Sequence, residues 1–67
     1  MSQPVQSVVR VSNQELATVR EAMRELGRLI TQLEQGEIEK VVLTQRNQMR
    51  AVLITLERYT ELEQRAA

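Results

Sequence analysis

The stretch Lys40–Leu62 reads KVVLTQRNQMRAVLITLERYTEL, and it decides the fold that the rest of the chain must fit. Two short apolar runs, Val41–Thr44 and Ala51–Thr55, flank a polar segment that carries two arginines. Runs of this length that are rich in β-branched residues predict strands, so the segment predicts a β-hairpin. The second run passes directly into Leu56–Leu62, whose spacing is that of an amphipathic helix with Thr55 as its N-cap.

The loop between the two runs, Gln45–Arg50, carries Arg46 and Arg50 beside side-chain amides and has no acidic residue. Guanidinium and amide groups donate hydrogen bonds to phosphate oxygens and to base edges in the grooves of DNA. Because the loop lacks glycine, Asn47 is the residue expected to take a positive φ. The loop therefore indicates contacts with DNA, against the alternative of an exposed turn whose arginines have no ligand.

Upstream of the hairpin, Val8–Val11 has the composition of a short strand. Ser12 is followed three positions later by Glu15, a capping-box pattern that predicts the start of a helix. Gly36 is expected to end this helix as a left-handed cap. Gly27 lies inside it at a cost in helix stability, so either one long helix or two helices fit the pattern.

Apolar residues recur through this predicted helix at intervals of three and four. They are Leu16, Val19, Met23, Leu26, Ile30 and Leu33. A stripe with this spacing indicates one face of a helix, and Ala22 and Leu29 widen it toward a face that packs on a sheet. We therefore expect the stripe to form the core rather than a coiled coil.

Both predicted hairpin strands are apolar on both faces, which predicts cover on both sides of the sheet. One long helix with one short helix covers only one face well. A chain of 67 residues without cysteine also buries too little surface to be comfortably stable alone. Both arguments predict a homodimer. The residues expected in the core or the dimer contact are Leu26, Ile30, Leu33, Val42, Val52 and Ile54.

Arg20, Arg24 and Arg28 recur every four residues and line one edge of the predicted helix, where they can meet successive phosphates. The alternative is a solvated face on which Glu21 and Glu25 neutralise them through i, i+3 pairs. The residues predicted to contact DNA are Arg10, Arg20, Arg24, Arg46, Asn47 and Arg50.

The composition argues against catalysis and predicts no metal, cofactor or small-molecule substrate. The chain has no histidine and no cysteine, and all nine acidic residues are glutamates. It has no glycine-rich phosphate loop and no metal-ligand spacing. The formal net charge of 0 gives no general attraction to nucleic acid, so a DNA-binding role depends on local arginine clusters. No apolar run has the length of a signal peptide or membrane span, which predicts a cytoplasmic protein that binds no membrane.

Residues 20–62 resemble the Phd/YefM ("prevent-host-death") antitoxins, small bacterial proteins with a recognisable order of motifs. The family has E-x-G at a helix end, a strand V-x-I-T-R, a polar turn and then A-V-L-x-S-L-E-x-Y. The counterparts in this chain are Glu34–Gly36, Val42–Arg46, Ala51–Thr55 and Leu56–Tyr59. The family's helix pattern S-E-A-R-x-N-L-x-x-L-I aligns without gaps to Arg20–Ile30.

The resemblance implies a dimerisation domain that binds operator DNA in its own promoter, and a C-terminal tail that wraps a toxin. It would place Tyr59 and Leu62 against the toxin. Three features depart from the family pattern. The predicted strand lies earlier in the chain than the family's strand. The arginine of S-E-A-R aligns with Met23, or with Glu15 if Ser12 is taken as the serine of the pattern. The glycine of the family's turn is missing. The chain also leaves almost no tail beyond its last helix.

The sequence thus predicts an α+β fold with a small three-stranded antiparallel sheet, a long helix and a short C-terminal helix in a Phd/YefM-like dimer. Residues 1–7 are expected to form a flexible arm, and residues 8–67 the dimerisation and DNA-binding domain. We predict an antitoxin-like transcriptional repressor that binds operator DNA as a homodimer, with a partner toxin as the family implies and further association of dimers left open. The alternative is a homodimeric adaptor that binds another protein and no DNA.

Overall fold

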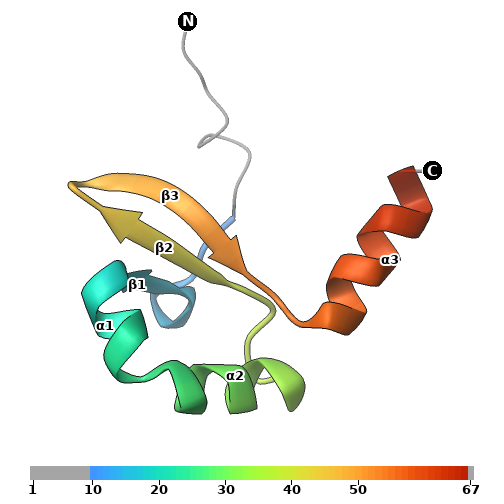
Figure 1. The fold of residues 1–67 in the computed structure, drawn as a ribbon, viewed down its shortest axis with the longest axis horizontal. Coiled ribbons are helices and arrows are strands. Elements are labelled where there is room, and N and C mark those ends of the chain that lie inside the picture. The colour runs from blue at the N-terminus through green and yellow to red at the C-terminus, as the bar shows by residue number, and fades with distance from the viewer. Residues whose placement is uncertain (1–9, 67) are drawn as a thin grey trace, which may run out of the picture.

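The computed structural model describes residues 10–66, which form a small α+β fold with a three-stranded mixed sheet and three α-helices (Figure 1). The elements are a 3₁₀ turn η2 (Asn13–Glu15), β1 (Leu16–Thr18), α1 (Val19–Arg24), α2 (Leu26–Glu34), β2 (Val41–Gln45), β3 (Gln48–Leu53) and α3 (Leu56–Ala66). The predicted arm over residues 1–7, together with Val8 and Val9, lies outside the described residues.

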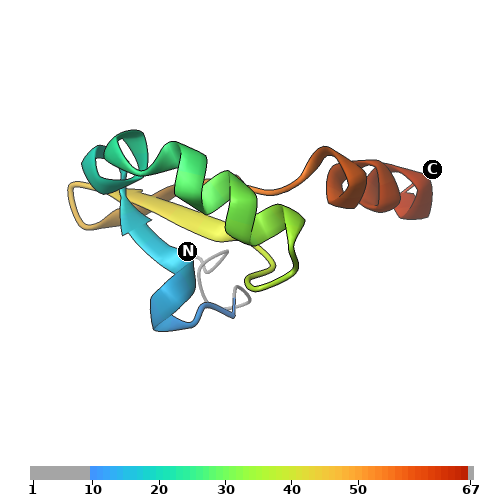
Figure 2. The same ribbon diagram turned by 90° about the horizontal axis from the view of Figure 1, so that it is seen from below.

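The sheet has the order β1-β2-β3, and its first pair of strands is parallel. Leu16 of β1 pairs with Val42 of β2, and Val42 pairs on its other side with Val52 of the antiparallel β3. The prediction of an antiparallel sheet is therefore wrong for β1. Helices α1 and α2 carry the chain back along one face of the sheet, as Figure 2 shows, so that β2 runs in the same direction as β1.

Among the described residues the first strand is Leu16–Thr18, and the helix begins later than predicted. Ser12 and Glu15 do interact as a capping box requires, because the Glu15 carboxylate accepts a hydrogen bond from the Ser12 N–H at 3.2 Å. That turn, however, is only η2. A second capping box begins α1: Glu21 exchanges hydrogen bonds of 3.0 Å with the Thr18 N–H and hydroxyl.

The predicted long helix is two helices, separated at Glu25 (φ −118°, ψ 24°) and not at Gly27. Helix α2 ends as predicted, because Gly36 takes a left-handed φ of 80°. The N–H groups of Gly36 and Glu37 donate to carbonyls of the last helical turn at 3.2 and 2.9 Å, which is a Schellman motif. This stop releases the chain toward β2.

The core lies between α1, α2 and one face of the sheet. Its buried apolar residues are Ala22, Leu29, Leu33, Ile38 and Val41. Val42 is also buried, but it alternates with Val41 and pairs with Leu16 and Val52 on the other face of the sheet. Ala22 and Leu29 face the sheet as predicted, but the buried face is rotated from the rest of the predicted stripe. Met23, for example, keeps 75% of its surface exposed.

The residues predicted for the core or the dimer contact therefore divide. Leu33 and Val42 are buried within the single chain, and Ile54 is half-buried. Leu26, Ile30 and Val52 are exposed, so they do not belong to the core of one chain. Their place in a dimer contact stays a prediction.

The hairpin and last helix follow the predicted order with a shifted second strand. Strand β3 begins at Gln48 and ends at Leu53, whereas the sequence predicted a strand over Ala51–Thr55. Thr55 instead caps α3 as predicted, since its hydroxyl accepts a hydrogen bond from the Arg58 N–H at 3.0 Å. Pairing extends into the predicted loop, since Gln45 pairs with Gln48 across a two-residue turn.

Glu15 ties η2 to the segment that enters β2. Its carboxylate accepts hydrogen bonds from the N–H groups of Ser12 and Glu39, both at 3.2 Å, and from Lys40 Nζ at 3.3 Å. These interactions, chiefly the Ser12 N–H and then the Glu39 N–H, lower the pKa of Glu15. The ionised carboxylate therefore stabilises the fold.

Glu15→Gln should lower the free energy of unfolding at neutral pH, because the amide carries no charge for Lys40. The folded-state pKa lies below the ordinary value near 4.5, so this stabilisation is present above that value and is lost as the pH falls through the folded-state pKa. Urea denaturation at about pH 7 and about pH 3 should show a difference from the unaltered chain that shrinks in acid. Exposed Glu34→Gln is the control, and an equal deficit at both pH values for Glu15→Gln would contradict the account.

Candidate nucleic-acid interface

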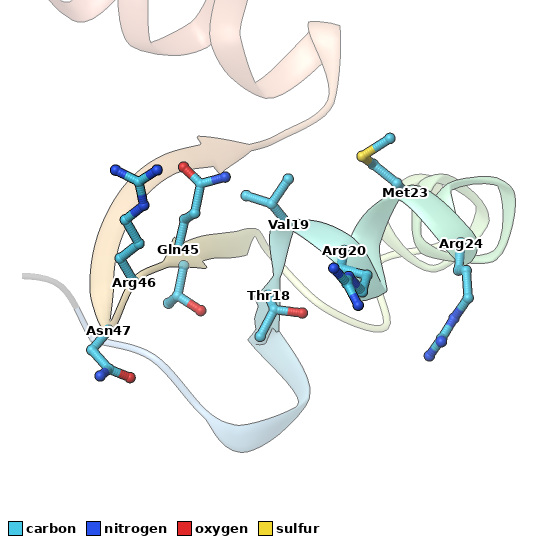
Figure 3. Close-up of a pocket in the computed structure, with 9 residues that line it drawn as sticks. Thr18, Val19, Arg20, Met23, Arg24, Gln45, Arg46 and Asn47 are labelled. Carbon is cyan, nitrogen blue, oxygen red and sulfur yellow. The ribbon is translucent and has the colours of Figure 1, made fainter.

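A hollow of about 720 Å³ opens where the carboxyl ends of β1 and β2 meet (Figure 3). These parallel strands place Thr18 opposite Thr44, so the segments that follow them start at the same edge of the sheet. The lining residues are Thr18, Val19, Arg20, Met23, Arg24, Thr44, Gln45, Arg46 and Asn47. We call this site the arginine hollow, because its lining holds three arginines and no acidic residue.

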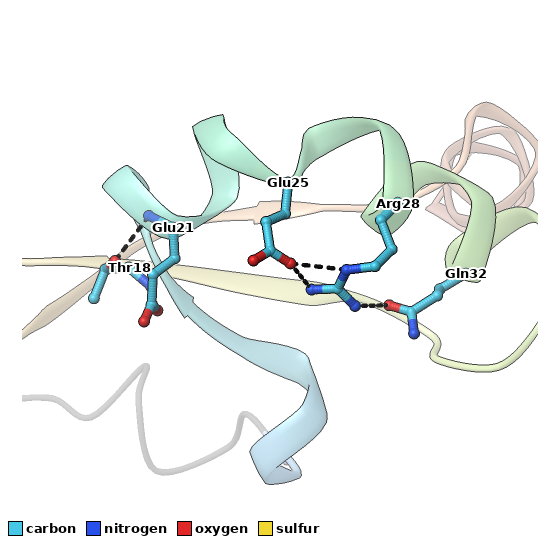
Figure 4. A network of polar contacts seen from close by, with 5 residues as sticks. All are labelled: Thr18, Glu21, Glu25, Arg28 and Gln32. Atoms are coloured by element: carbon cyan, nitrogen blue, oxygen red, sulfur yellow. Dashed lines mark hydrogen bonds and ion pairs between the residues drawn. The ribbon is translucent and has the colours of Figure 1, made fainter.

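The two arginines of α1, Arg20 and Arg24, form no ion pair within residues 10–66. The neighbouring Glu21 is engaged by the capping box, in which its carboxylate accepts the Thr18 N–H (Figure 4). That hydrogen bond is the main cause of a lowered pKa at Glu21, and the charge of Arg24 contributes less. Glu21 thus serves the helix start, and the predicted Glu21–Arg24 pair does not form.

Arg28 behaves differently from the other two arginines of the helical segment. Its Nε donates to the Glu25 carboxylate at 2.8 Å, and its Nη1 donates to the Gln32 amide oxygen at 3.1 Å (Figure 4). Arg28 is also absent from the lining of the arginine hollow. The alternative of a neutralised helix face therefore holds for Arg28 and not for Arg20 or Arg24.

The β2–β3 connection is a two-residue turn, not the predicted loop over Gln45–Arg50. Both turn residues are left-handed, with φ of 56° at Arg46 and 63° at Asn47. Positive φ at both central residues is typical of a type I′ turn, whose twist matches that of the flanking strands. The prediction for Asn47 is confirmed. The left-handed Arg46 was missed, because a residue with a long side chain rarely adopts this conformation.

Arg46→Gly should raise the free energy of unfolding by about 1 kcal/mol, because a left-handed conformation costs a residue with a Cβ roughly 1–2 kcal/mol. Arg50→Gly is a matched control that removes the same charge from an exposed position of β3, where the backbone φ is not positive and the residue lies at a register shift of the hairpin. Glycine inside a strand costs about 0.5–1 kcal/mol, so this control should lower the free energy. Urea denaturation measures both, and a loss of stability in both variants would show that the turn holds no strain at Arg46.

The side chains of the hollow combine donors with a small apolar surface. In Figure 3, Arg46 and Met23 extend to one side of the hollow, and Arg24 and Asn47 extend to the other. Guanidinium groups make strong charge-assisted hydrogen bonds to phosphates, while amides and hydroxyls serve as further donors. The arrangement is therefore suited to a polyanion that passes between α1 and the turn.

Four of the six residues predicted to contact DNA line this hollow, namely Arg20, Arg24, Arg46 and Asn47. Arg50 lies in β3 and Arg10 at the start of the described segment, and neither lines it. Thr18 and Thr44 were missed as site residues. The capping pattern of Thr18 with Glu21 was the signal that could have placed the start of α1, and with it the edge of the site.

Tyr59 and Leu62, which the resemblance would place against a toxin, are exposed on α3 and do not line the hollow.

Comparisons with models of known families, with curated proteins and with solved structures find no match for this chain. Within residues 10–66, none of the helices has the length and apolar character that crossing a membrane requires. The Phd/YefM resemblance therefore stays a prediction from the sequence pattern.

Proposed function

We propose that this protein is an antitoxin-like transcriptional repressor that binds operator DNA as a homodimer. The observation that carries the proposal is the arginine hollow, whose lining holds Arg20, Arg24 and Arg46 and no acidic residue. Neutralising phosphates with arginine releases counterions and supplies a large share of DNA affinity. A chain whose net charge is 0 nevertheless gathers three positive charges at one site.

The position of β1 supports the resemblance that suggested this function. The Phd/YefM pattern has its strand immediately before the S-E-A-R helix, and β1 ends at Thr18, directly before the matched Arg20–Ile30. Strand β1 thus lies where the family pattern has its strand, later in the chain than the valine run. The family arginine falls on Met23, which lines the hollow together with Arg20 and Arg24, so these neighbours can supply the charge.

A homodimer is proposed because residues 10–66 leave large apolar side chains exposed. Helices α1 and α2 cover one face of the sheet (Figure 2), while Leu16 and Val52, which pair with Val42 on the other face, are exposed. A two-fold dimer presents two arginine hollows, and two symmetric sites match the half-sites of a palindromic operator. Occupation of the promoter by such a dimer would repress transcription.

The second candidate is an adaptor that binds another protein and no DNA. The exposed apolar face of α3 favours it, because no residue of this helix is buried. On this alternative the arginines would be solvated. The two candidates differ in one measurable property, which is affinity for DNA that falls with salt.

Fluorescence anisotropy with a duplex from upstream of the protein's own gene tests the proposal. We expect binding that is tighter than to an unrelated duplex of equal length, and that weakens steeply between about 50 and 200 mM salt. A repeat with the unrelated duplex separates operator recognition from general phosphate binding. Absence of binding at micromolar protein would refute the DNA proposal and favour the adaptor.

A further inference from the structure

Two helical surfaces of this chain expose large apolar side chains that nothing within residues 10–66 covers. On α3 these are Leu56, Tyr59 and Leu62, with 80%, 51% and 41% of their surfaces exposed. On α1 and α2 they are Met23, Leu26 and Ile30, which we call the α1–α2 stripe. Monomeric proteins rarely expose contiguous apolar patches of several hundred Å². Each surface therefore requires a partner.

The two surfaces do not meet within one chain. Thr55 caps α3 only two residues after β3 ends, which determines where the helix begins. Figures 1 and 2 show α3 extending away from the sheet and from α1 and α2. The occupant of the stripe consequently comes from another molecule, and each further copy of the chain brings a matching helix.

The two surfaces are similar in make-up, because each presents three large apolar side chains. Those of α3 span Leu56–Leu62, about 9 Å along one helix axis. The stripe crosses the break at Glu25, with Met23 in α1 and Leu26 and Ile30 about one turn apart in α2. Six large side chains that are 40% to 80% exposed amount to several hundred Å² of apolar surface per copy. That approaches the ~800 Å² that a stable interface takes from each partner.

Gly27 gives an independent indication that a helix approaches the stripe closely. It lies inside α2 beside Leu26, where glycine disfavours the helix, and a Cβ at this position would have no neighbour within 4 Å. The single chain thus gives no steric reason for a glycine here. A helix that packs over this position would give one, because it could approach the backbone of α2.

We propose that two copies associate by exchanging α3, so that the apolar face of each α3 packs on the α1–α2 stripe of the other copy over Gly27. Two reciprocal contacts of this kind close a two-fold dimer. The inference rests on the proposed homodimer for its second copy, but it needs no DNA. It reassigns Tyr59 and Leu62 from a toxin contact to a contact between copies.

Sedimentation equilibrium of the full chain tests the exchange. Tyr59→Glu on α3 and Gly27→Leu on the stripe should each weaken dimerisation at least about 30-fold, as truncation of a central interface residue does. Leucine favours a helix more than glycine does, so dissociation of Gly27→Leu is not a folding defect. Gln64→Glu, at an exposed polar position of α3 outside its apolar face, is the control that adds the same charge and should stay dimeric. Dimers that survive Tyr59→Glu or Gly27→Leu would overturn the proposal.

Mixing the two variants distinguishes exchange from contact between identical surfaces. A Gly27→Leu chain retains its α3, and a Tyr59→Glu chain retains its stripe, so an equimolar mixture should form heterodimers through one intact contact. No association in the mixture would overturn the exchange. If the exchange is overturned in either of these ways, the proposed DNA binding is still tested separately by anisotropy. If the unaltered chain is monomeric, both the exchange and the proposed homodimer are overturned.

Discussion

Replacing Arg24 and Arg46 together with alanine should lower operator affinity by roughly 100-fold at low salt, because hydrogen bonds to charged groups are worth about 1.5–3 kcal/mol each. Both residues line the arginine hollow from opposite elements, α1 and the β2–β3 turn. If they neutralise phosphates, the logarithmic salt dependence should fall by about one unit for each arginine that is removed. Anisotropy titrations at several salt concentrations measure both quantities.

The matched control for this variant is Arg28→Ala with Arg65→Ala. It removes the same formal charge per chain, but Arg28 is paired with Glu25 and Arg65 lies in the last turn of α3. We expect a smaller decrease in affinity than for the hollow. An equal decrease in both double variants would mean that total charge, and not the arrangement in the hollow, determines binding.

Operator variants add a separate measurement of what each arginine binds. Removing a side chain that binds phosphate weakens binding to all sequences alike, whereas removing one that binds a base relaxes specificity at one position. Single Arg20→Ala, Arg24→Ala and Arg46→Ala chains titrated against a panel of mutated operators should separate the two cases. Arg46 extends from a turn, where it is the residue expected to reach base edges.

Features with a local cause were predicted correctly from the sequence. Gly36 ends α2, Asn47 takes a positive φ and Thr55 caps α3. Each outcome depends on the residue itself and on neighbours a few positions away, so a short window of sequence contains the relevant physics. The order of hairpin and last helix follows from these signals.

Strand β1 was not predicted from the sequence because two capping boxes follow each other. Ser12 with Glu15 closes η2, and only Thr18 with Glu21 begins α1. Leu16, in the strand between them, fits helical spacing by chance with the residues that follow. Its pairing with β2 depends on residues distant in sequence, and a periodic pattern does not report such pairing.

The candidate site was predicted in part for the same reason. Charge alone singled out Arg20, Arg24 and Arg46, but their place in the lining of one hollow depends on the parallel pairing of β1 with β2. The left-handed backbone at Arg46 had no signal in the sequence, because arginine has no preference for that conformation. A strained residue that lines the hollow is consistent with selection for binding rather than stability.

Leu29→Ala should have the largest effect on stability, a decrease of about 2–5 kcal/mol in the free energy of unfolding. Leu29 is 5% exposed and packs in the core between α2 and the sheet. Truncation removes buried apolar surface and leaves a cavity that the small fold cannot readily fill. Since small domains have a total stability of only about 5–15 kcal/mol, the variant should be largely unfolded at moderate urea.

Leu16→Ala is the control of the same residue type. Leu16 belongs to the predicted helix stripe but lies in β1, with 45% of its surface exposed. Its truncation should cost less than about 1.5 kcal/mol, because part of the side chain already contacts water. Comparing the two losses of stability tests which face of the predicted helix is buried. If the predicted stripe formed the core, Leu16 would be a core residue and Leu16→Ala would be the more damaging change. Urea denaturation of both variants at equal protein concentration decides which leucine lies in the core.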